Sequence, residues 1–313
     1  MDHRIVPTRY HNTFGPHEPI ASIADGDRII TTTVDCRGHD ARDALVTDAH
    51  PNPLTGPFYI EGAEPGDLLA VRLERIQPSR DTAISKSVVA AHLLDPGAVR
   101  GLPPGEQVVW QLDLDEGLAW PLDPPARLAY LRLPLTPMLG CLGVAPEGGQ
   151  AISSATSGPY GGNMDWRGTV AGTTVFFPVF QEGALLFLGD GHAVQGDGEI
   201  VGQGLETAME VSLTVRVEHG LEAKWPRAES DAAIMTLGNA RPLSEALQHA
   251  TTEMQRWLAD VYGLDAHAAG TLMGQCVRYE VGNAFDPAYT MVCVLDKRWL
   301  LKSWDASARC RPL

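Results

Sequence analysis

The sequence predicts a mainly β protein, with a sandwich- or barrel-like body of short antiparallel strands followed by an α+β C-terminal part. Three observations support this fold class. The 313 residues include 32 glycines and 23 prolines, which favour short strands joined by tight turns over long helices. Two strand–turn–strand units occupy the first 76 residues, and a stripe of apolar residues at helical spacing lies near the C-terminus.

The two N-terminal units follow one pattern. An alternating segment at 19–23 leads through the turn Asp25-Gly-Asp27 into the β-branched strand 28–34. The second unit joins residues 57–60 to the strand 68–76 through Glu64-Pro-Gly-Asp67. In that turn Pro presets its φ and Gly supplies a positive φ, which predicts a type II turn.

The middle of the chain is less regular. Residues 77–130 are rich in proline and acidic residues, and we interpret them as an irregular excursion around one strand at 107–112. Strand patterns return at 138–144, 173–179, 184–188 and 208–217. We therefore predict a β-rich body over residues 1–220 that carries the functional site.

The C-terminal part, residues 221–313, is predicted to be an α+β subdomain packed on this body. Apolar residues between 243 and 261 recur at a 3.6-residue spacing, which predicts a helix over 244–262. Ser244 is the expected N-cap and Gly263 the expected stop. A second helix is expected over 265–281.

Composition limits the classes of partner. The formal net charge of −15 argues against nucleic acid, because a phosphate backbone would be repelled. The sequence shows neither a signal-peptide pattern nor an apolar run long enough for a membrane span. Five scattered cysteines without a CxxC spacing predict reduced thiols, and hence a cytoplasmic protein.

The segment Leu188–Glu199 is the strongest functional signal. It places Asp190, His192, Gln195, Asp197 and Glu199 among four glycines directly after an apolar strand. Asp190 and His192 are two residues apart, so an extended backbone would project both from one face. A histidine nitrogen with carboxylate oxygens suits zinc, and Glu199 could take a proton from water. The alternative is a hairpin loop whose Asp and Gly residues serve only turn chemistry.

Two further clusters could join this motif. Asp35 ends a strand and is followed by His39, although a solvated loop histidine is the more common case. The loop Gly161-Gly-Asn-Met-Asp165 could present the N–H groups of Gly161 and Gly162 to a carbonyl oxygen as an oxyanion hole. A simple glycine turn explains the same loop equally well.

Several long motifs, taken together, resemble the acetamidase/formamidase family. The resemblance covers roughly residues 10–220 and is specific because the motifs occur in the family's order. The matching segments are Gly56-Pro-Phe-Tyr-Ile-Glu-Gly-Ala-Glu-Pro-Gly-Asp67, Gly140-Cys-Leu-Gly-Val-Ala-Pro146, Gly161-Gly-Asn-Met-Asp165, Phe177-Pro-Val179 and Gly189-Asp-Gly-His-Ala-Val-Gln-Gly-Asp-Gly-Glu199.

The resemblance implies hydrolysis of the C–N bond of short aliphatic amides to ammonia and a carboxylate, on a β-rich fold. It also implies a divalent metal, with zinc expected and calcium as the alternative, and a homodimer or higher homo-oligomer. The family's polar motif positions fall on Asn163, Asp165, Asp190, His192, Gln195, Asp197 and Glu199, and also on Asp35, the acid that ends the early strand.

The sequence-based prediction is a metal-dependent amidase. Asp190 and His192, with Asp35 or Asp165, would hold the metal, and Glu199 would carry the proton. Asn163, Asp165 and Gln195 complete the predicted catalytic set. One alternative is a metal-free amidase that uses Cys36 as nucleophile with Glu61 or His39 as base. The other is a small-molecule binding protein with a structural Ca²⁺ bound by oxygen ligands.

Overall fold

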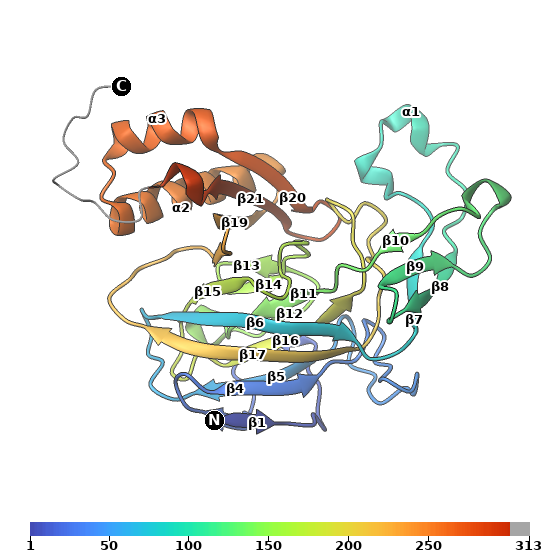
Figure 1. Ribbon diagram of the computed structural model, residues 1–313, viewed down its shortest axis with the longest axis horizontal. Coiled ribbons are helices and arrows are strands. Elements are labelled where there is room, and N and C mark those ends of the chain that lie inside the picture. The colour runs from blue at the N-terminus through green and yellow to red at the C-terminus, as the bar shows by residue number, and fades with distance from the viewer. Residues whose placement is uncertain (301–313) are drawn as a thin grey trace.

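A computed structural model describes residues 1–300 and confirms the mainly β fold with an α+β C-terminal part (Figure 1). The sheets in this region are open, and none closes into a barrel. The largest sheet has nine strands. In spatial order they are β1 (Asp2–Arg4), β4 (Arg28–Thr32), β17 (Met209–Glu218), β6 (Leu68–Pro78), β15 (Thr174–Pro178), β18 (Arg227–Glu229), β19 (Ala233–Ala240), β21 (Tyr289–Asp296) and β20 (Arg278–Asn283).

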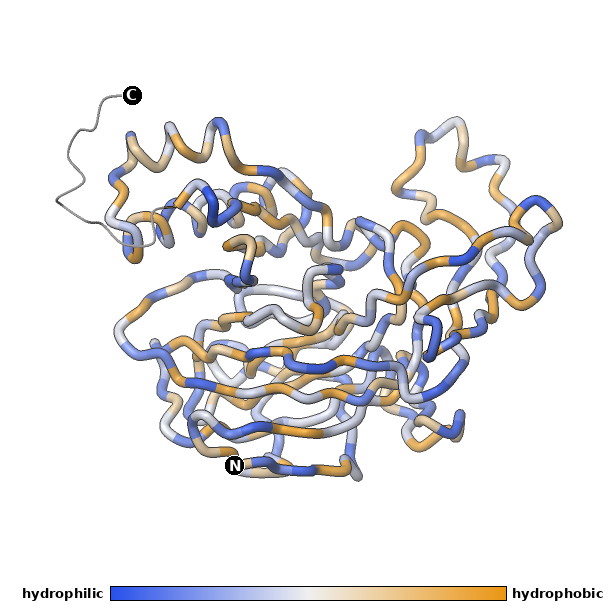
Figure 2. Tube along the Cα trace, viewed as in Figure 1, coloured by the Kyte–Doolittle hydropathy of each residue, from blue (hydrophilic) through white to orange (hydrophobic). Residues whose placement is uncertain are grey.

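The centre of this sheet follows from the alternating sequence. β6 pairs antiparallel with β17, and hydrophobic and hydrophilic residues alternate along both strands (Figure 2). The predicted turn before β6 is confirmed, because the Asp67 N–H donates to the Glu64 carbonyl and Gly66 has φ +102°. Such alternation buries one face of the sheet against the core and leaves the other face toward solvent.

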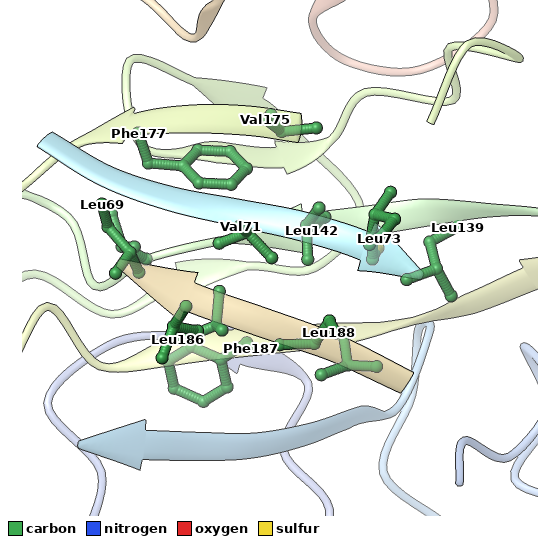
Figure 3. Close-up of a cluster of buried hydrophobic side chains, with 14 of the residues drawn as sticks. Leu69, Val71, Leu73, Leu139, Leu142, Val175, Phe177, Leu186, Phe187 and Leu188 are labelled. Carbon is green, nitrogen blue, oxygen red and sulfur yellow. The ribbon is translucent and has the colours of Figure 1, made fainter. Parts of the chain in front are cut away.

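A six-stranded sheet packs against the first through a shared core. Figure 3 shows side chains of β6, β15, β11 and β16 gathered in this buried cluster, among them Leu69, Phe177, Leu142 and Phe187. Each such side chain contributes about 1.5–3 kcal/mol when fully buried. The six strands are β13 (Ser157–Gly158), β14 (Gly161–Asn163), β11 (Met138–Gly143), β16 (Leu186–His192), β5 (Leu54–Ile60) and β3 (Ala21–Ile23). A two-stranded sheet pairs β2 (Thr13–Phe14) with β12 (Ile152–Ser153).

The excursion at 77–130 contains more regular structure than the sequence predicted. It supplies most of a four-stranded sheet that projects from the body on the same side as the short helix α1 (Pro96–Val99) (Figure 1). Its small core contains Ala83, Leu112 and Ala119. The expected strand at 107–112 is present as β8. The four strands are β10 (Leu133–Pro134), β9 (Leu118–Pro121), β8 (Gln107–Asp113) and β7 (Thr82–Lys86).

Two helices pack on the C-terminal strands of the nine-stranded sheet, β19 and β21. The sheet itself includes strands from both sides of residue 220. α2 (Leu243–Tyr262) ends at Gly263 in the left-handed conformation, as predicted. The expected Ser244 N-cap is wrong, since the helix begins one residue earlier, after Pro242. α3 (Ala266–Cys276) is shorter than predicted because Val277 is extended and leads into β20. Within residues 1–300, no helix is long and apolar enough to cross a bilayer.

Candidate active site

The central motif lies at the end of β16, between β11 and β5. Asp190 and His192 are both buried and project together, with His192 Nε2 3.6 Å from Asp190 Oδ1. Packing requires a glycine between them, because a Cβ on Gly191 would lie 2.2 Å from Met209 Cγ. The two-residue spacing therefore brings a carboxylate and an imidazole to one point, as the sequence predicted.

Gln195 fixes the orientation and tautomer of His192. The Gln195 side-chain nitrogen donates to the backbone carbonyls of Asp165 and Gly282, so its oxygen must face the imidazole. His192 Nδ1 consequently donates to Gln195 Oε1 at 2.8 Å. Nε2 is then the nitrogen left for a ligand, which is the usual arrangement around a metal-binding histidine.

Glu206 completes this group and was not predicted from the sequence. The chain leaves β16, turns through the glycine-rich segment and returns beside His192 in an isolated antiparallel bridge. Glu206 Oε1 lies 3.1 Å from His192 Nε2 and accepts the Gly204 N–H. One ligand atom from each of Asp190, His192 and Glu206 lies within 4.8 Å of the others, a spacing that could hold a metal ion.

Asp165 and Glu199 face the same imidazole from other segments. They form a second group with His192 in which the ligand atoms also lie within 4.8 Å of one another. The side-chain nitrogen of Asn283, on β20, donates to Asp165 Oδ2 at 2.6 Å and to Glu199 Oε2 at 3.3 Å. A strand of the C-terminal part thus positions two carboxylates of the N-terminal motifs.

A third amide–carboxylate contact joins the predicted loop residue Asn163 to this network. Asn163 donates from Nδ2 to Asp286 Oδ2 at 2.6 Å, and its Oδ1 accepts from the Cys141 thiol. Asp286 also accepts from Asn283. Neither Asn283 nor Asp286 lies in a motif that sequence reasoning singled out.

The backbone at the site is strained. Seven non-glycine residues among those described have positive φ, and three of them are Asp165, Asp190 and Glu199. A fourth, Asn52, donates to Asp190 Oδ2 at 3.1 Å. Left-handed conformations at such residues cost about 1–3 kcal/mol each and persist only where the surroundings enforce them. Their coincidence at one site indicates that the geometry serves a function.

Four buried polar atoms converge without a hydrogen-bond partner within residues 1–300. They are Asp165 Oδ1, Asp190 Oδ1, Glu206 Oε2 and His192 Nε2, whose 3.1 Å approach to Glu206 Oε1 lacks hydrogen-bond geometry. Buried polar atoms in proteins are almost always paired, because an unpaired one costs about 1–3 kcal/mol. An imidazole nitrogen and carboxylate oxygens form a donor set that zinc accepts, so the residues fit a divalent cation.

Burial and mutual repulsion alter the acidity of these groups. Burial raises the pKa of Glu206 to about 7 and raises the pKa of Glu199 and of Asp165 well above their usual range. Burial alone would lower the pKa of His192, but the carboxylates of Glu206 and Asp190 outweigh it and raise that pKa. A concentration of negative charge this large is what a bound cation would offset.

A cavity of about 300 Å³ opens onto these groups. Its buried lining residues, here called the floor, are Asn163, Asp190, Glu199 and Glu206. Two basic residues, here called the rim, are the half-buried Arg37 and the exposed Lys86. The rest of the lining includes Cys36, Asn52, Gln203, Phe285 and Asp286.

The chain is similar in sequence and in fold to known proteins of one family. A sequence profile described as the Acetamidase/Formamidase family matches residues 3–149 and 142–271. This chain belongs to the acetamidase/formamidase family. The fold is similar to that of an acetamidase from Yersinia enterocolitica, with a TM-score of 0.83, 31% identity and coverage of 96% of this chain and 94% of that one. An acetamidase from Bacillus halodurans is similar at 30% identity and TM-score 0.82, over 95% and 98% of the two chains.

A formamidase of Methylophilus methylotrophus is 27% identical over 247 residues, which are 61% of this chain. The match spans only 59% of that formamidase's length.

The structure explains why glycines occur in two of the family motifs. Gly140, which opens the Gly140–Pro146 motif, lies directly beneath the site. A Cβ there would lie 2.3 Å from Asp165 Oδ1 and 2.8 Å from Asp190 Oδ2, so glycine leaves room for both carboxylates. Gly161 and Gly162 lie between β13 and β11 and are absent from the cavity lining. Their missing side chains admit close strand packing, since a Cβ on Gly161 would lie 2.5 Å from the Leu142 carbonyl oxygen.

Asp35 does not join the group around His192. Its Oδ2 accepts from Arg80 Nη2 at 2.6 Å, and its Oδ1 accepts the backbone N–H groups of Arg37 and His39. The carboxylate is therefore engaged in shaping the loop that carries Cys36 and Arg37 to the cavity. Asp197 lies at the surface in an ion pair with Arg167.

The residues of the alternative thiol mechanism, Cys36 with Glu61 or His39 as base, do not lie together at the cavity. Cys36 lines the cavity, but burial, followed by the nearby carboxylates of Glu206 and Asp190, raises its pKa well above the usual value. Glu61 is exposed and bonded to Ser22, and His39 lies beside Asp35. Neither candidate base is among the cavity-lining residues.

Proposed function

We propose that this protein is an amidohydrolase that cleaves the C–N bond of short aliphatic amides, releasing ammonia and a carboxylate. We further propose that Asp190, His192 and Glu206 hold a divalent cation, with zinc favoured over calcium. The observation that carries the metal site is the convergence of unpaired buried atoms, including His192 Nε2, Asp190 Oδ1 and Glu206 Oε2. Calcium prefers six to eight oxygen ligands, whereas an imidazole nitrogen suits zinc.

The protein's own residues have distinct roles in this mechanism. A bound zinc ion would supply Lewis-acid activation of water and of the amide carbonyl. Gln195 holds the His192 ring in the ligand-competent tautomer. Asn283 holds the carboxylates of Asp165 and Glu199 in place despite their repulsion.

We assign proton transfer to Glu199. It lines the cavity, while Asp165 does not, so a substrate amide could reach it. Amide nitrogen is a poor leaving group and must be protonated as the C–N bond breaks, which requires a positioned acid. Asn163 lines the same cavity and is held by Asp286, so it is placed to orient the substrate.

The first experiment pairs elemental analysis of purified protein with an ammonia-release assay over formamide, acetamide and propionamide. We expect zinc and measurable release. Glu199→Gln should lower kcat by about a hundredfold to ten-thousandfold, the usual contribution of a general acid–base, while bound metal is retained. Unchanged turnover with loss of metal would contradict the role assigned to Glu199. A tightly held calcium and no ammonia from any amide would instead favour a binding protein.

We also propose that the protein is a cytoplasmic homodimer or higher homo-oligomer. The family resemblance supports this proposal, and the scattered cysteines are consistent with a reducing compartment. Light scattering of the purified chain tests the oligomer, and a monomer at micromolar concentration would contradict it.

A further inference from the structure

The excursion at 77–130 contributes directly to the cavity. Lys86 is the last residue of β7 and lines the cavity, where its Nζ lies 5.3 Å from the centroid of the Phe285 ring. Directly opposite Lys86 in the β7–β8 ladder is Gln107, whose side-chain oxygen accepts a hydrogen bond from Arg37 Nη1. The small sheet thus supplies one cation of the rim and orients the other.

Within the described part of the chain, both rim cations lack an acidic partner. Among residues 1–300, neither Arg37 nor Lys86 forms an ion pair with a carboxylate. Other cations of the described residues, such as Arg4 and Arg216, also lack an ion pair, but only Arg37 and Lys86 do so in the lining of this cavity. Guanidinium and ammonium groups without an acidic partner in the lining of one cavity are a binding arrangement for an anion, and a guanidinium can bind a carboxylate with two hydrogen bonds.

The cavity is electrically polarised as a result. Its floor carries the buried carboxylates of Asp190, Glu199 and Glu206, and its rim carries the positive charges. An anionic group is attracted by the rim, so a ligand with one anionic end gains binding energy when that end lies beside Arg37 and Lys86. In that orientation the neutral end points to the floor.

The size of the cavity is consistent with a longer ligand. Its volume of about 300 Å³ is roughly ten times the share of one molecule in liquid water, about 30 Å³. Formamide or acetamide at the floor would leave most of this space, including the region between the two cations, filled by water. A substrate long enough to extend from the floor to the rim would also gain binding energy from Arg37 and Lys86.

From this arrangement we propose that the preferred substrates are amides whose acyl chain ends in a carboxylate, that is, monoamides of short dicarboxylic acids. The amide lies at the floor and the distal carboxylate lies between Arg37 and Lys86. This inference rests on the proposed amidase function and names its substrate class. Hydrolysis of such an amide adds water across the C–N bond and yields ammonia and a dicarboxylate.

The test compares succinamate with 4-oxopentanamide, which has the same chain length and a neutral ketone in place of the carboxylate. We expect kcat/KM for succinamate to exceed that for the ketone by about tenfold or more, since a charge-assisted hydrogen bond contributes about 1.5–3 kcal/mol. Lys86→Gln and Arg37→Gln should each lower this ratio by about tenfold, mainly through the KM of succinamate, and Lys86→Arg should restore most of it.

Arg216→Gln is the matched control, because it removes one positive charge from an exposed position on β17 outside the cavity. It should leave the ratio unchanged. Equal kcat/KM for the two amides, or an equal loss for both in Lys86→Gln, would overturn the inference while leaving the amidase function intact.

A binding measurement decides the inference even if no amide is hydrolysed. Calorimetric titration of the metal-loaded protein with succinamate should show binding that weakens about tenfold in Lys86→Gln. Binding that is absent, or independent of Lys86 and Arg37, would overturn the proposed substrate class. Failure of ammonia release together with Lys86-dependent binding would instead overturn the proposed reaction.

Discussion

The floor and the rim of the cavity are built in different ways. The floor carboxylates and His192 come from core strands and tight loops, are almost fully buried, and adopt left-handed backbone conformations at Asp190 and Glu199. The rim residues Arg37 and Lys86 come from a surface loop and the end of a strand in a peripheral sheet. The difference indicates that the floor fixes the chemistry while the rim selects the substrate, and substitutions should have smaller effects toward the rim.

The largest expected effect is at Glu206 in the floor. Glu206→Gln removes one negative ligand from the proposed metal group, and we expect metal loss and a fall in kcat of at least about a thousandfold, as several kcal/mol of charge stabilisation disappear. Metal content and ammonia release measure it.

Asp35→Asn is the matched control for this change. It removes an equally buried charge, but one that pairs with Arg80. Leaving that guanidinium uncompensated should destabilise the fold by about 3–5 kcal/mol while metal stays bound. Metal loss in Asp35→Asn with full metal in Glu206→Gln would reverse the ligand assignment in favour of Asp35.

The contrast between Glu206 and Asp35 shows which site residues the sequence could predict and which it could not. Asp190 and His192 could be predicted because a spacing of two on a strand fixes their common direction. Glu206 could not, since its place beside His192 depends on how the intervening loop returns to β16. Asp35 looked like a ligand because it ends a strand, but its partner Arg80 is 45 residues away and invisible in the sequence.

The same limit applies to the fold. Regular alternation of apolar and polar residues predicted β6 and β17, and the Pro-Gly-Asp sequence predicted the type of turn that precedes β6. In the peripheral sheet only β8 was predicted, whereas β7 and β9 were not, because they are short and pack on a core of only a few residues. Asn283 was missed for a related reason, since a lone asparagine on a late strand carries no local signal of the carboxylates it meets across the structure.

A smaller effect is expected at Gln195, directly behind the floor. Gln195→Leu removes the acceptor of the His192 Nδ1 proton, so the ring can rotate or change tautomer. Partners of this kind typically contribute about tenfold to a hundredfold in metal affinity. Competition with a metal chelator measures the change.

Gln181→Leu provides the comparison for Gln195. It also removes a glutamine that bonds a backbone carbonyl, that of Pro146, but outside the cavity lining. Equal zinc affinity in the two variants would show that Gln195 has no special role behind the floor.

The smallest effect is expected at Cys36, which lines the cavity beside the rim residue Arg37. If the floor performs the chemistry, Cys36→Ser should change kcat/KM by no more than about twofold, because a buried thiol with a raised pKa is a poor nucleophile. A cysteine nucleophile would also need a base within reach, and neither His39 nor Glu61 lines the cavity. Ammonia release at saturating and limiting amide measures both constants. A loss of about a thousandfold or more, with zinc content unchanged, would move the chemistry from the floor to the thiol and overturn the division between floor and rim.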